Sequence, residues 1–180
     1  AGGDVGARRR LLDATPQGEP LYRQFGFQPF GRLTRWRRGA SPAKAAALPP
    51  GAFDLDALTA VDAKALGFLR PGLLQELVLR PGSRCLRVAD AFGVVREGRS
   101  AHQIGPVLAA SEASAAGLVR RIADALPGPL VADASDERSE FCDALSAAGF
   151  VRERTSTPMA LAGPGQTLPQ GDTFLINAIA

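Results

Sequence analysis

Short apolar runs and segments with helical spacing of apolar residues take turns along most of the chain. The apolar runs predict strands at residues 9–14, 27–38, 84–89, 92–96, 101–108, 129–134 and 150–161. Helical spacing predicts helices over residues 16–25, 54–63, 71–79, 111–126 and 136–148. Strands and helices in this order favour an α/β fold, with a mixed sheet flanked by helices.

Two segments, residues 9–38 and residues 130–161, share one order of features. Each has a strand ending in Asp-Ala, a helix ending at glycine, and a second strand that begins with phenylalanine. The matching residues are Asp13 and Asp133, Gly26 and Gly149, and Phe27 and Phe150. The pattern predicts an internal duplication, although strand–helix–Gly-Phe is also common in unrelated α/β proteins.

A change in composition separates the two copies. Residues 39–53 are rich in Gly, Pro and Ala, which is typical of a linker. We therefore expect a first lobe in residues 1–38, a second lobe in residues 54–162 and a C-terminal extension in residues 163–180. Only eight residues precede the duplicated part of the first copy. Because a core of this kind needs roughly 100 residues, we expect the first lobe to be the C-terminal remnant of a truncated domain.

The composition excludes some classes of protein. Hydrophobic residues make up 46% of the 180 residues and charged residues 22%, which is an ordinary globular balance. The net charge of +3 permits anionic ligands without requiring nucleic acid. No run approaches the ~20 apolar residues of a membrane span. We expect a cytoplasmic protein that binds neither nucleic acid nor a membrane.

The cysteines and the single histidine offer little for a metal site. Cys85 and Cys142 lie far apart without a CxxC motif, so two reduced and buried thiols are favoured over a disulfide. His102 is expected to be an ordinary half-exposed strand residue rather than a catalytic base. We therefore predict no metal.

Two charged runs have structural and functional interpretations. The run from Arg35 to Arg38 contains Trp36, which could stack on a nucleic-acid base, but packing by the tryptophan with solvent-facing arginines is favoured. The acidic residues Asp133, Asp136, Glu137 and Glu140 are expected to lie at a helix start, where they complement the helix dipole; a site for a cationic substrate is the second interpretation.

The most informative motif is Leu21-Tyr22-Arg23-Gln24-Phe25-Gly26-Phe27. It resembles the later half of the GNAT N-acetyltransferase superfamily, in which a helix ends Leu-Tyr-x-x-x-Gly-Phe before a strand. Three further segments resemble a subgroup with two GNAT-like lobes: Asp13-Ala14-Thr15-Pro16, Ile104-Gly105-Pro106-Val107 and Met159-Ala160-Leu161. The helix start departs from the commonest pattern, because Thr15 and Gly18 stand where the superfamily often has Asn and Ala.

The resemblance implies a catalytic role for Tyr22. Aminolysis of a thioester expels a thiolate, and a tyrosine hydroxyl, whose pKa is ordinarily near 10, can protonate that sulfur. In the superfamily this tyrosine is commonly the general acid. The resemblance also implies acetyl-CoA as cosubstrate, and we place Thr15 and Gly18 beside it. The alternative is that Tyr22 only packs beside Phe25, with its hydroxyl at the surface.

The second copy lacks the features that this chemistry needs. Leu145 stands four residues before Gly149, where the first copy has its tyrosine, and leucine has no proton to give. The superfamily binds the CoA pyrophosphate in a glycine-rich loop that opens a helix. Here residues 107–114 contain no glycine, and Glu112 places a negative charge at the helix start. We expect no CoA binding in the second lobe.

We therefore expect a GNAT-type enzyme that transfers an acetyl group from acetyl-CoA to the primary amine of a small molecule or peptide. The catalytic residue would lie in the first lobe. The rival interpretation is a non-catalytic binding or dimerisation module, which leaves a homodimer open.

Overall fold

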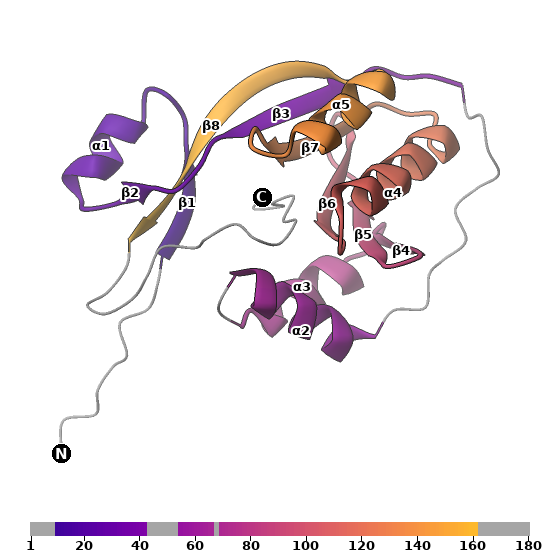
Figure 1. The fold of residues 1–180 in the computed structure, drawn as a ribbon, viewed down its shortest axis with the longest axis horizontal. Helices are drawn as coiled ribbons and strands as arrows, with labels where there is room; N and C mark the ends of the chain where they lie inside the picture. Colours follow the sequence, from indigo (N-terminus) through magenta and orange to yellow (C-terminus); the bar gives the residue numbers. More distant parts are fainter. Residues whose placement is uncertain (1–9, 43–53, 67–68, 162–180) are drawn as a thin grey trace.

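The computed structural model describes residues 10–42, 54–66 and 69–161 (Figure 1). The strands are β1 (Arg10–Ala14), β2 (Gln28–Pro29), β3 (Leu33–Arg38), β4 (Arg84–Val88), β5 (Ala91–Arg96), β6 (His102–Leu108), β7 (Leu130–Ser135) and β8 (Val151–Leu161). The helices are α1 (Glu19–Gln24), α2 (Leu55–Leu66), α3 (Pro71–Leu79), α4 (Glu112–Ala125) and α5 (Ser139–Ala147). The predicted α/β class is confirmed.

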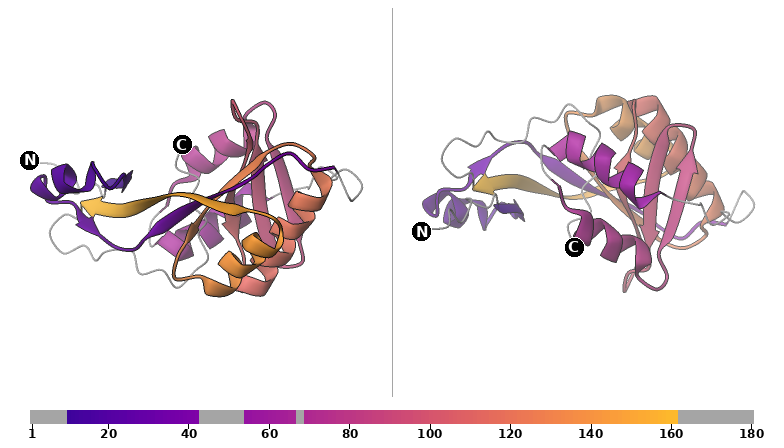
Figure 2. Two further views of the ribbon diagram at one scale, coloured as in Figure 1. Left: turned by 90° about the horizontal axis from the view of Figure 1, so that it is seen from above. Right: turned by 90° about the horizontal axis from the view of Figure 1, so that it is seen from below.

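The described strands form one mixed sheet. Its order is β1-β8-β3-β7-β6-β5-β4, and β2 also pairs with β8. The β6–β7 pair is parallel, and the other pairs are antiparallel. In Figures 1 and 2, β3 and β8 run from the main body of the sheet out to α1. The helix that carries Tyr22 therefore lies at the far end of two long strands.

Two apolar clusters hold helices against the sheet. The larger one joins α4 and α5 to β3, β5, β6 and β7, and includes Trp36, Ile104, Leu118, Ile122 and Phe141. The smaller one joins α2 and α3 to β4, β5 and β6, and includes Leu58, Leu74, Val78, Val94 and Leu108. The predicted periodicity of residues 111–126 is confirmed, because Leu118, Ile122 and Leu126 are all buried in the larger cluster.

The two copies exchange strands. β3 lies between β7 and β8, and its Thr34 is paired with Ala134 of β7. The C-terminal half of β8 lies between β1 and β2, and its Thr157 is paired with Ala14 of β1. The second strand of each copy is thus inserted beside the first strand of the other copy. The pairings of β3 with β7 and of β1 with β8 therefore join the two expected lobes in one sheet.

The two copies also end their first helix in the same way. Gly26 follows α1 with a φ of +83°, and Gly149 follows α5 with a φ of +85°. Both values lie in the left-handed region that glycine adopts without a Cβ clash. The organisation into tandem lobes, with residues 1–38 as a truncated remnant and 54–162 as a second lobe, stays a prediction. Most of the linker and all of the extension at 163–180 lie outside the described residues.

Two boundaries differ from the sequence-based expectation. The helix expected over residues 16–25 begins only at Glu19, because a turn precedes it. In this turn the carbonyl of Thr15 accepts hydrogen bonds from the N–H groups of Gly18 and Glu19 at 3.0 and 2.9 Å. The long strand expected at 27–38 is divided into β2 and β3. Proline at position 29 cannot donate a backbone hydrogen bond, which is consistent with a break in the pairing there.

The expectation for the arginine-rich run is correct for tryptophan and wrong for two arginines. Trp36 is buried, and the guanidinium of Arg152 lies 4.9 Å from its ring centre. Arg38 is also buried and donates hydrogen bonds to the carbonyls of Ala123 and Leu126 at 2.6 and 2.7 Å. These carbonyls end α4, where a cation is favoured by the helix dipole. Arg35 is half-buried against Asp133.

The acidic residues after position 132 do not share one helix start. Asp133 lies within β7 and pairs with Arg35, whereas Asp136 accepts a hydrogen bond from Thr34. Their positions are fixed by partners about 100 residues earlier, which local sequence does not reveal. The thiols of Cys85 and Cys142 are free and buried, as predicted. Among the described residues no helix is long and apolar enough to span a membrane, and no group of metal-ligating side chains is present.

Candidate active site

Thr15, Gly18 and Tyr22 come together in the turn that leads into α1. The N–H of Gly18 donates to the carbonyl of Thr15 at 3.0 Å and to its hydroxyl at 3.2 Å. A Cβ atom at Gly18 would lie 3.5 Å from Cε2 of Tyr22 and 3.3 Å from Oγ1 of Thr15. A side chain at position 18 would therefore press on the Thr15 hydroxyl and make only an ordinary contact with the tyrosine ring.

The ring of Tyr22 packs on Phe27 rather than on Phe25. The two ring centres are 5.8 Å apart and the planes are inclined by 68°, which is an edge-to-face arrangement. Phe25 is one of the most exposed large apolar side chains among the described residues. The backbone carbonyl of Tyr22 accepts hydrogen bonds from the N–H groups of Phe25 and Phe27. Tyr22 is thus held at the end of a short helix with its side chain half-buried.

A strand from the other copy fixes α1 in place. Oε2 of Glu19 accepts a hydrogen bond from the hydroxyl of Thr157 on β8 at 2.7 Å. Oε1 of Glu19 receives Nε and Nη2 of Arg23 at 2.9 and 2.6 Å. The hydrogen bond from Thr157, and then that from Arg23, hold the pKa of Glu19 below its ordinary value. The helix that carries Tyr22 therefore depends on β8 for one of its anchors.

The equivalent position in the second copy is part of the core. Leu145 on α5 is fully buried and belongs to the larger apolar cluster. Ile122 and Phe141 belong to the same cluster. The sequence-based expectation that this copy presents no acid at the position is consistent with its buried environment.

The N-terminus of α4 does not fit a diphosphate. Ser111 caps the helix by accepting the N–H of Ser114 at 3.1 Å. The carboxylate of Asp90 also faces this turn: hydrogen bonds from the Ser114 side chain, from its own backbone and from the backbone of Ala110 hold its pKa below its ordinary value. Backbone groups that would receive a phosphate are therefore already paired with a hydroxyl and a carboxylate.

Glu112 has a role that the sequence did not reveal. Its Oε2 accepts the backbone N–H of Phe141, in the first turn of α5, at 2.9 Å. The carboxylate therefore links the starts of two neighbouring helices. It adds a second negative charge near the same helix N-terminus, which opposes phosphate binding there.

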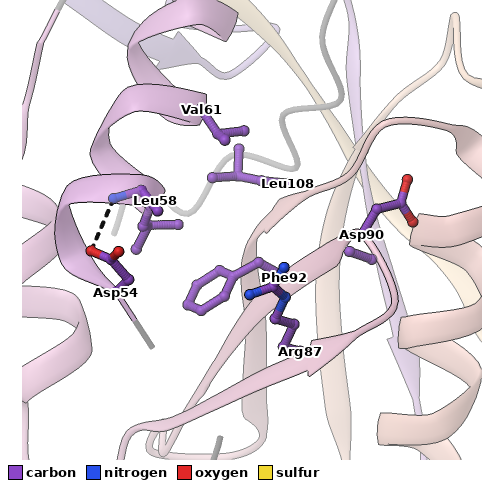
Figure 3. A pocket seen from close by; sticks show the side chains of 9 residues that line it. Asp54, Leu58, Val61, Arg87, Asp90, Phe92 and Leu108 are labelled. Atoms are coloured by element: carbon purple, nitrogen blue, oxygen red, sulfur yellow. Dashed lines mark hydrogen bonds between the residues drawn. The ribbon is translucent and has the colours of Figure 1, made fainter. Parts of the chain in front are cut away.

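A small cavity lies next to this turn, between α2 and the β4–β5 hairpin (Figure 3). Its volume is about 140 Å³, and its lining includes Leu58, Val61, Phe92 and Leu108, with Arg87 and Asp90 also present. Asp54 caps α2 beside it, accepting the N–H groups of Asp56 and Ala57 at 3.0 and 3.1 Å. The cavity is smaller than the ~300–1,000 Å³ typical of ligand sites, so it offers room for a small group only.

His102 lies at the start of β6 and is half-buried. Its backbone N–H donates to the carbonyl of Pro129 at 2.9 Å, and its ring lies beside Gly128. It is apart from Tyr22 in the fold, since β6 and α1 lie at different ends of the sheet (Figure 1). The expectation of an ordinary strand residue fits this position.

Comparison with known proteins agrees with this architecture. An acetyltransferase (GNAT) domain family matches residues 58–175. YitH of Bacillus subtilis, an uncharacterized N-acetyltransferase, is 28% identical over 160 residues, which cover 79% of this chain and 54% of that protein. The chain thus spans about half the length of this relative.

Solved structures share the fold. A Pyrococcus horikoshii protein assigned to the acetyltransferases has a TM-score of 0.71 at 22% identity, over 96% of this chain and 59% of that one. A GCN5-related N-acetyltransferase from Sphaerobacter thermophilus has a TM-score of 0.52 at 12% identity, over 85% of this chain and 59% of that one. With the family match over residues 58–175, these findings establish that the chain belongs to the GNAT acetyltransferase family.

Proposed function

We propose that this chain is part of an N-acetyltransferase that moves an acetyl group from acetyl-CoA to the primary amine of a small molecule or peptide. The observation that carries the proposal is the contrast between two equivalent positions. Tyr22 is a half-buried tyrosine on α1, whereas Leu145 is a buried core residue on α5. Only the first of these positions offers a proton.

The proposed chemistry assigns one step to Tyr22. The unprotonated amine attacks the thioester carbonyl, and a C–N bond forms as the C–S bond breaks. The Tyr22 hydroxyl donates its proton to the departing CoA sulfur, the amine nitrogen loses a proton to solvent, and Tyr22 takes a proton back from solvent. A positioned acid of this kind typically contributes about 10²–10⁴-fold to the rate.

The cosubstrate is proposed to lie on the Thr15 and Gly18 side of the molecule. The α4 turn is already occupied by Ser111 and Asp90, so it is the less suitable place for a diphosphate. Thr15 and Gly18 lie beside the Tyr22 ring, so a cosubstrate held by this turn would lie next to the proposed acid. The free, buried thiols support a reducing cytoplasmic location.

The alternative function is a non-catalytic binding or dimerisation module. Two features of the second copy favour it. Asp90 occupies the turn where a diphosphate would bind, and Leu145 stands where the first copy has its tyrosine. Under this alternative, the full-length protein would neither bind acetyl-CoA nor transfer an acetyl group, with or without Tyr22.

The test combines binding with turnover. Calorimetric titration with acetyl-CoA measures cosubstrate binding by the chain, and thiol release from acetyl-CoA in the presence of a panel of amines measures transfer by the full-length protein. Tyr22→Phe is expected to lower kcat about 10²-fold or more with little change in KM. Phe25→Leu, an exposed neighbour on the same turn, is the matched control. Full activity of the Tyr22→Phe protein would contradict the catalytic role, and absence of both binding and transfer would favour the alternative.

A further inference from the structure

Four charged side chains lie on one face of the sheet: Asp13 on β1, Arg35 on β3, Arg96 on β5 and Asp133 on β7. We call this set the ionic face. It lies on the side of the sheet opposite α4 and α5, because the alternate β7 residues Leu130, Ala132 and Ala134 point into the larger apolar cluster. None of the four belongs to the turn that holds Tyr22.

Strand register places the outer members on this face. Arg96 is paired with Gln103, and Gln103 with Val131, which is two residues from Asp133. Asp13 is paired with Pro158, two residues from Ser156. Ser156 is in turn paired with Leu33, two residues from Arg35. Paired residues and residues two apart in a strand point to the same side.

The centre of the ionic face is a satisfied ion pair. Nε and Nη2 of Arg35 donate to the two carboxylate oxygens of Asp133 at 2.7 and 2.6 Å. This two-point geometry is the strong form of the arginine–carboxylate interaction. It uses both oxygens of Asp133, so neither oxygen is left for Arg96, and no described residue donates to Oδ1 of Asp13.

Asp13 has an unused acceptor. Its Oδ1 is buried, and no described residue donates a hydrogen bond to it. Burial raises the pKa of Asp13, the charge of Asp133 raises it further, and Arg35 partly offsets both. The carboxylate therefore lies close to the central pair and lacks a cation of its own.

Arg96 has unused donors. Its side chain is only 2% exposed, and neither Nε nor Nη2 donates to any described residue. Burial lowers its pKa, the charge of Arg80 lowers it further, and Asp133 opposes them. A buried guanidinium without an acceptor costs stability, and a bound anionic group would remove that cost.

The sheet opens at the middle of the ionic face. Pairing between β6 and β7 ends at Ile104 and Ala132, so Asp133 has no paired residue on β6. The unused atoms of Asp13 and Arg96 thus belong to a face where neighbouring strands part. One carboxylate acceptor and two guanidinium donors are left for a ligand.

We propose that the ionic face binds the acceptor of the reaction as a zwitterion, an amine that also carries a carboxylate. The ammonium group pairs with Asp13, and the carboxylate pairs with Arg96. A simple amine would leave Arg96 unpaired, and a simple anion would leave Asp13 unpaired. The identification of this ligand as an acceptor rests on the proposed function, whereas its binding does not.

The first experiment uses a series of linear amino acids of increasing chain length. Calorimetric titration of the full chain with β-alanine, 4-aminobutanoate, 6-aminohexanoate and 8-aminooctanoate varies the separation of the two charges. We expect the affinity to peak at one length. It should exceed that of the alkylamine and the alkyl carboxylate of the same length by about tenfold or more, because each charged hydrogen bond contributes to binding.

Substitutions assign the two ends. Asp13→Asn is expected to reduce affinity for the best zwitterion about tenfold and to leave affinity for the matched carboxylate unchanged. Arg96→Gln is expected to reduce affinity for the best zwitterion as well, and to leave affinity for the matched alkylamine unchanged. Asp143→Asn and Arg84→Gln, at exposed positions outside the ionic face, are the matched controls. Arg96→Met serves as a second variant if Arg96→Gln fails to fold, since it replaces the buried charge with an apolar chain.

Three outcomes decide the proposal. Saturable binding of one zwitterion that is lost in the Asp13 and Arg96 variants supports it. Absence of saturable binding to every member of the series overturns it, and so does binding that the folded Arg96→Met protein retains in full. If the zwitterion binds but is not acetylated when acetyl-CoA is added to the full-length protein, the proposed function fails while the binding site stands.

Discussion

The hydroxyl of Thr157 donates to the carboxylate of Glu19 at 2.7 Å, and this bond ties an exchanged strand to the helix that carries Tyr22. The other copy has the same device, in which Thr34 on β3 donates to Asp136 before α5 at 2.5 Å. Each threonine comes eight residues after the glycine that ends the first helix of its copy. The exchanged strands are therefore fastened by matched hydrogen bonds as well as by backbone pairing.

The two threonine bonds predict unequal losses of stability. Thr34 is fully buried, so Thr34→Val should lower the free energy of unfolding by roughly 1.5–3 kcal/mol, the usual value of a hydrogen bond to a charged group. Thr157→Val should cost clearly less, because Glu19 is exposed to solvent and keeps Arg23. Urea denaturation measures both. Equal stability of the Thr34→Val protein and the wild type would show that the bond is not formed.

Asp13 predicts an unusual dependence of stability on pH. Its pKa in the folded protein is raised above its ordinary value of 3.8, mainly by burial. Its contribution to stability is thus fully present below about pH 3.8 and is lost as the pH rises through the folded pKa. Asp13→Asn should therefore be at least as stable as the wild type at pH 7, with the difference disappearing in acid.

Asp133→Asn is the control for Asp13→Asn. It breaks the ion pair with Arg35 and leaves a half-buried guanidinium, so a loss of roughly 2–4 kcal/mol is expected at pH 7. Denaturation at several pH values compares the two variants. A large loss at pH 7 from Asp13→Asn would contradict the assignment of its raised pKa to burial.

Substitutions of Leu145 and Tyr22 are predicted to have opposite effects: the first should lower stability, and the second should lower activity alone. Leu145→Ala removes a fully buried side chain and should destabilise the protein by about 2–5 kcal/mol. Tyr22→Phe should change stability by about 0.5 kcal/mol or less, because the hydroxyl makes no hydrogen bond with the described residues and the ring is retained. Thermal unfolding of both variants gives the comparison. A strongly destabilised Tyr22→Phe protein would favour a packing role over the catalytic one.

The thiol of Cys85 is predicted to react slowly with alkylating reagents in the native protein. Burial raises its pKa to about 11 from 9.0, so the thiol stays protonated in the native protein at pH 8.5. Its contribution to stability is complete below about pH 9 and is lost as the pH rises through 11. Iodoacetamide should therefore label Cys85 slowly in native protein and rapidly in urea, as measured by mass spectrometry. Rapid native labelling would contradict the buried position.

Local sequence predicted which segments form helices and strands better than it predicted which strands pair with one another. Ser111 and the apolar positions at 118, 122 and 126 were sufficient to predict α4, because capping and helical periodicity act within a few residues. Apolar character also marked residues 33–38 as a strand. It could not show that this strand would be inserted between β7 and β8, since either edge of a sheet satisfies the same backbone groups.

The same limit applies to the charged residues. Arg35 and Asp133 are 98 positions apart, and Arg38 is 85 positions from the carbonyl of Ala123. Each residue alone is typical of an exposed strand end, so a solvent-facing role was the natural expectation. The Leu-Tyr-x-x-x-Gly-Phe motif was informative for the opposite reason, because its residues act together within one turn, and the family that it indicated is confirmed.

The exchange of β3 and β8 makes each of the two segments depend on the other for the pairing of its strands. In two independent units, an inactive copy could be deleted without harm to the other. Here the copy that carries Leu145 also supplies β8, which separates β1 from β2 and anchors α1 through Thr157. A chain cut between the two segments should accordingly stay associated as two interlocked fragments.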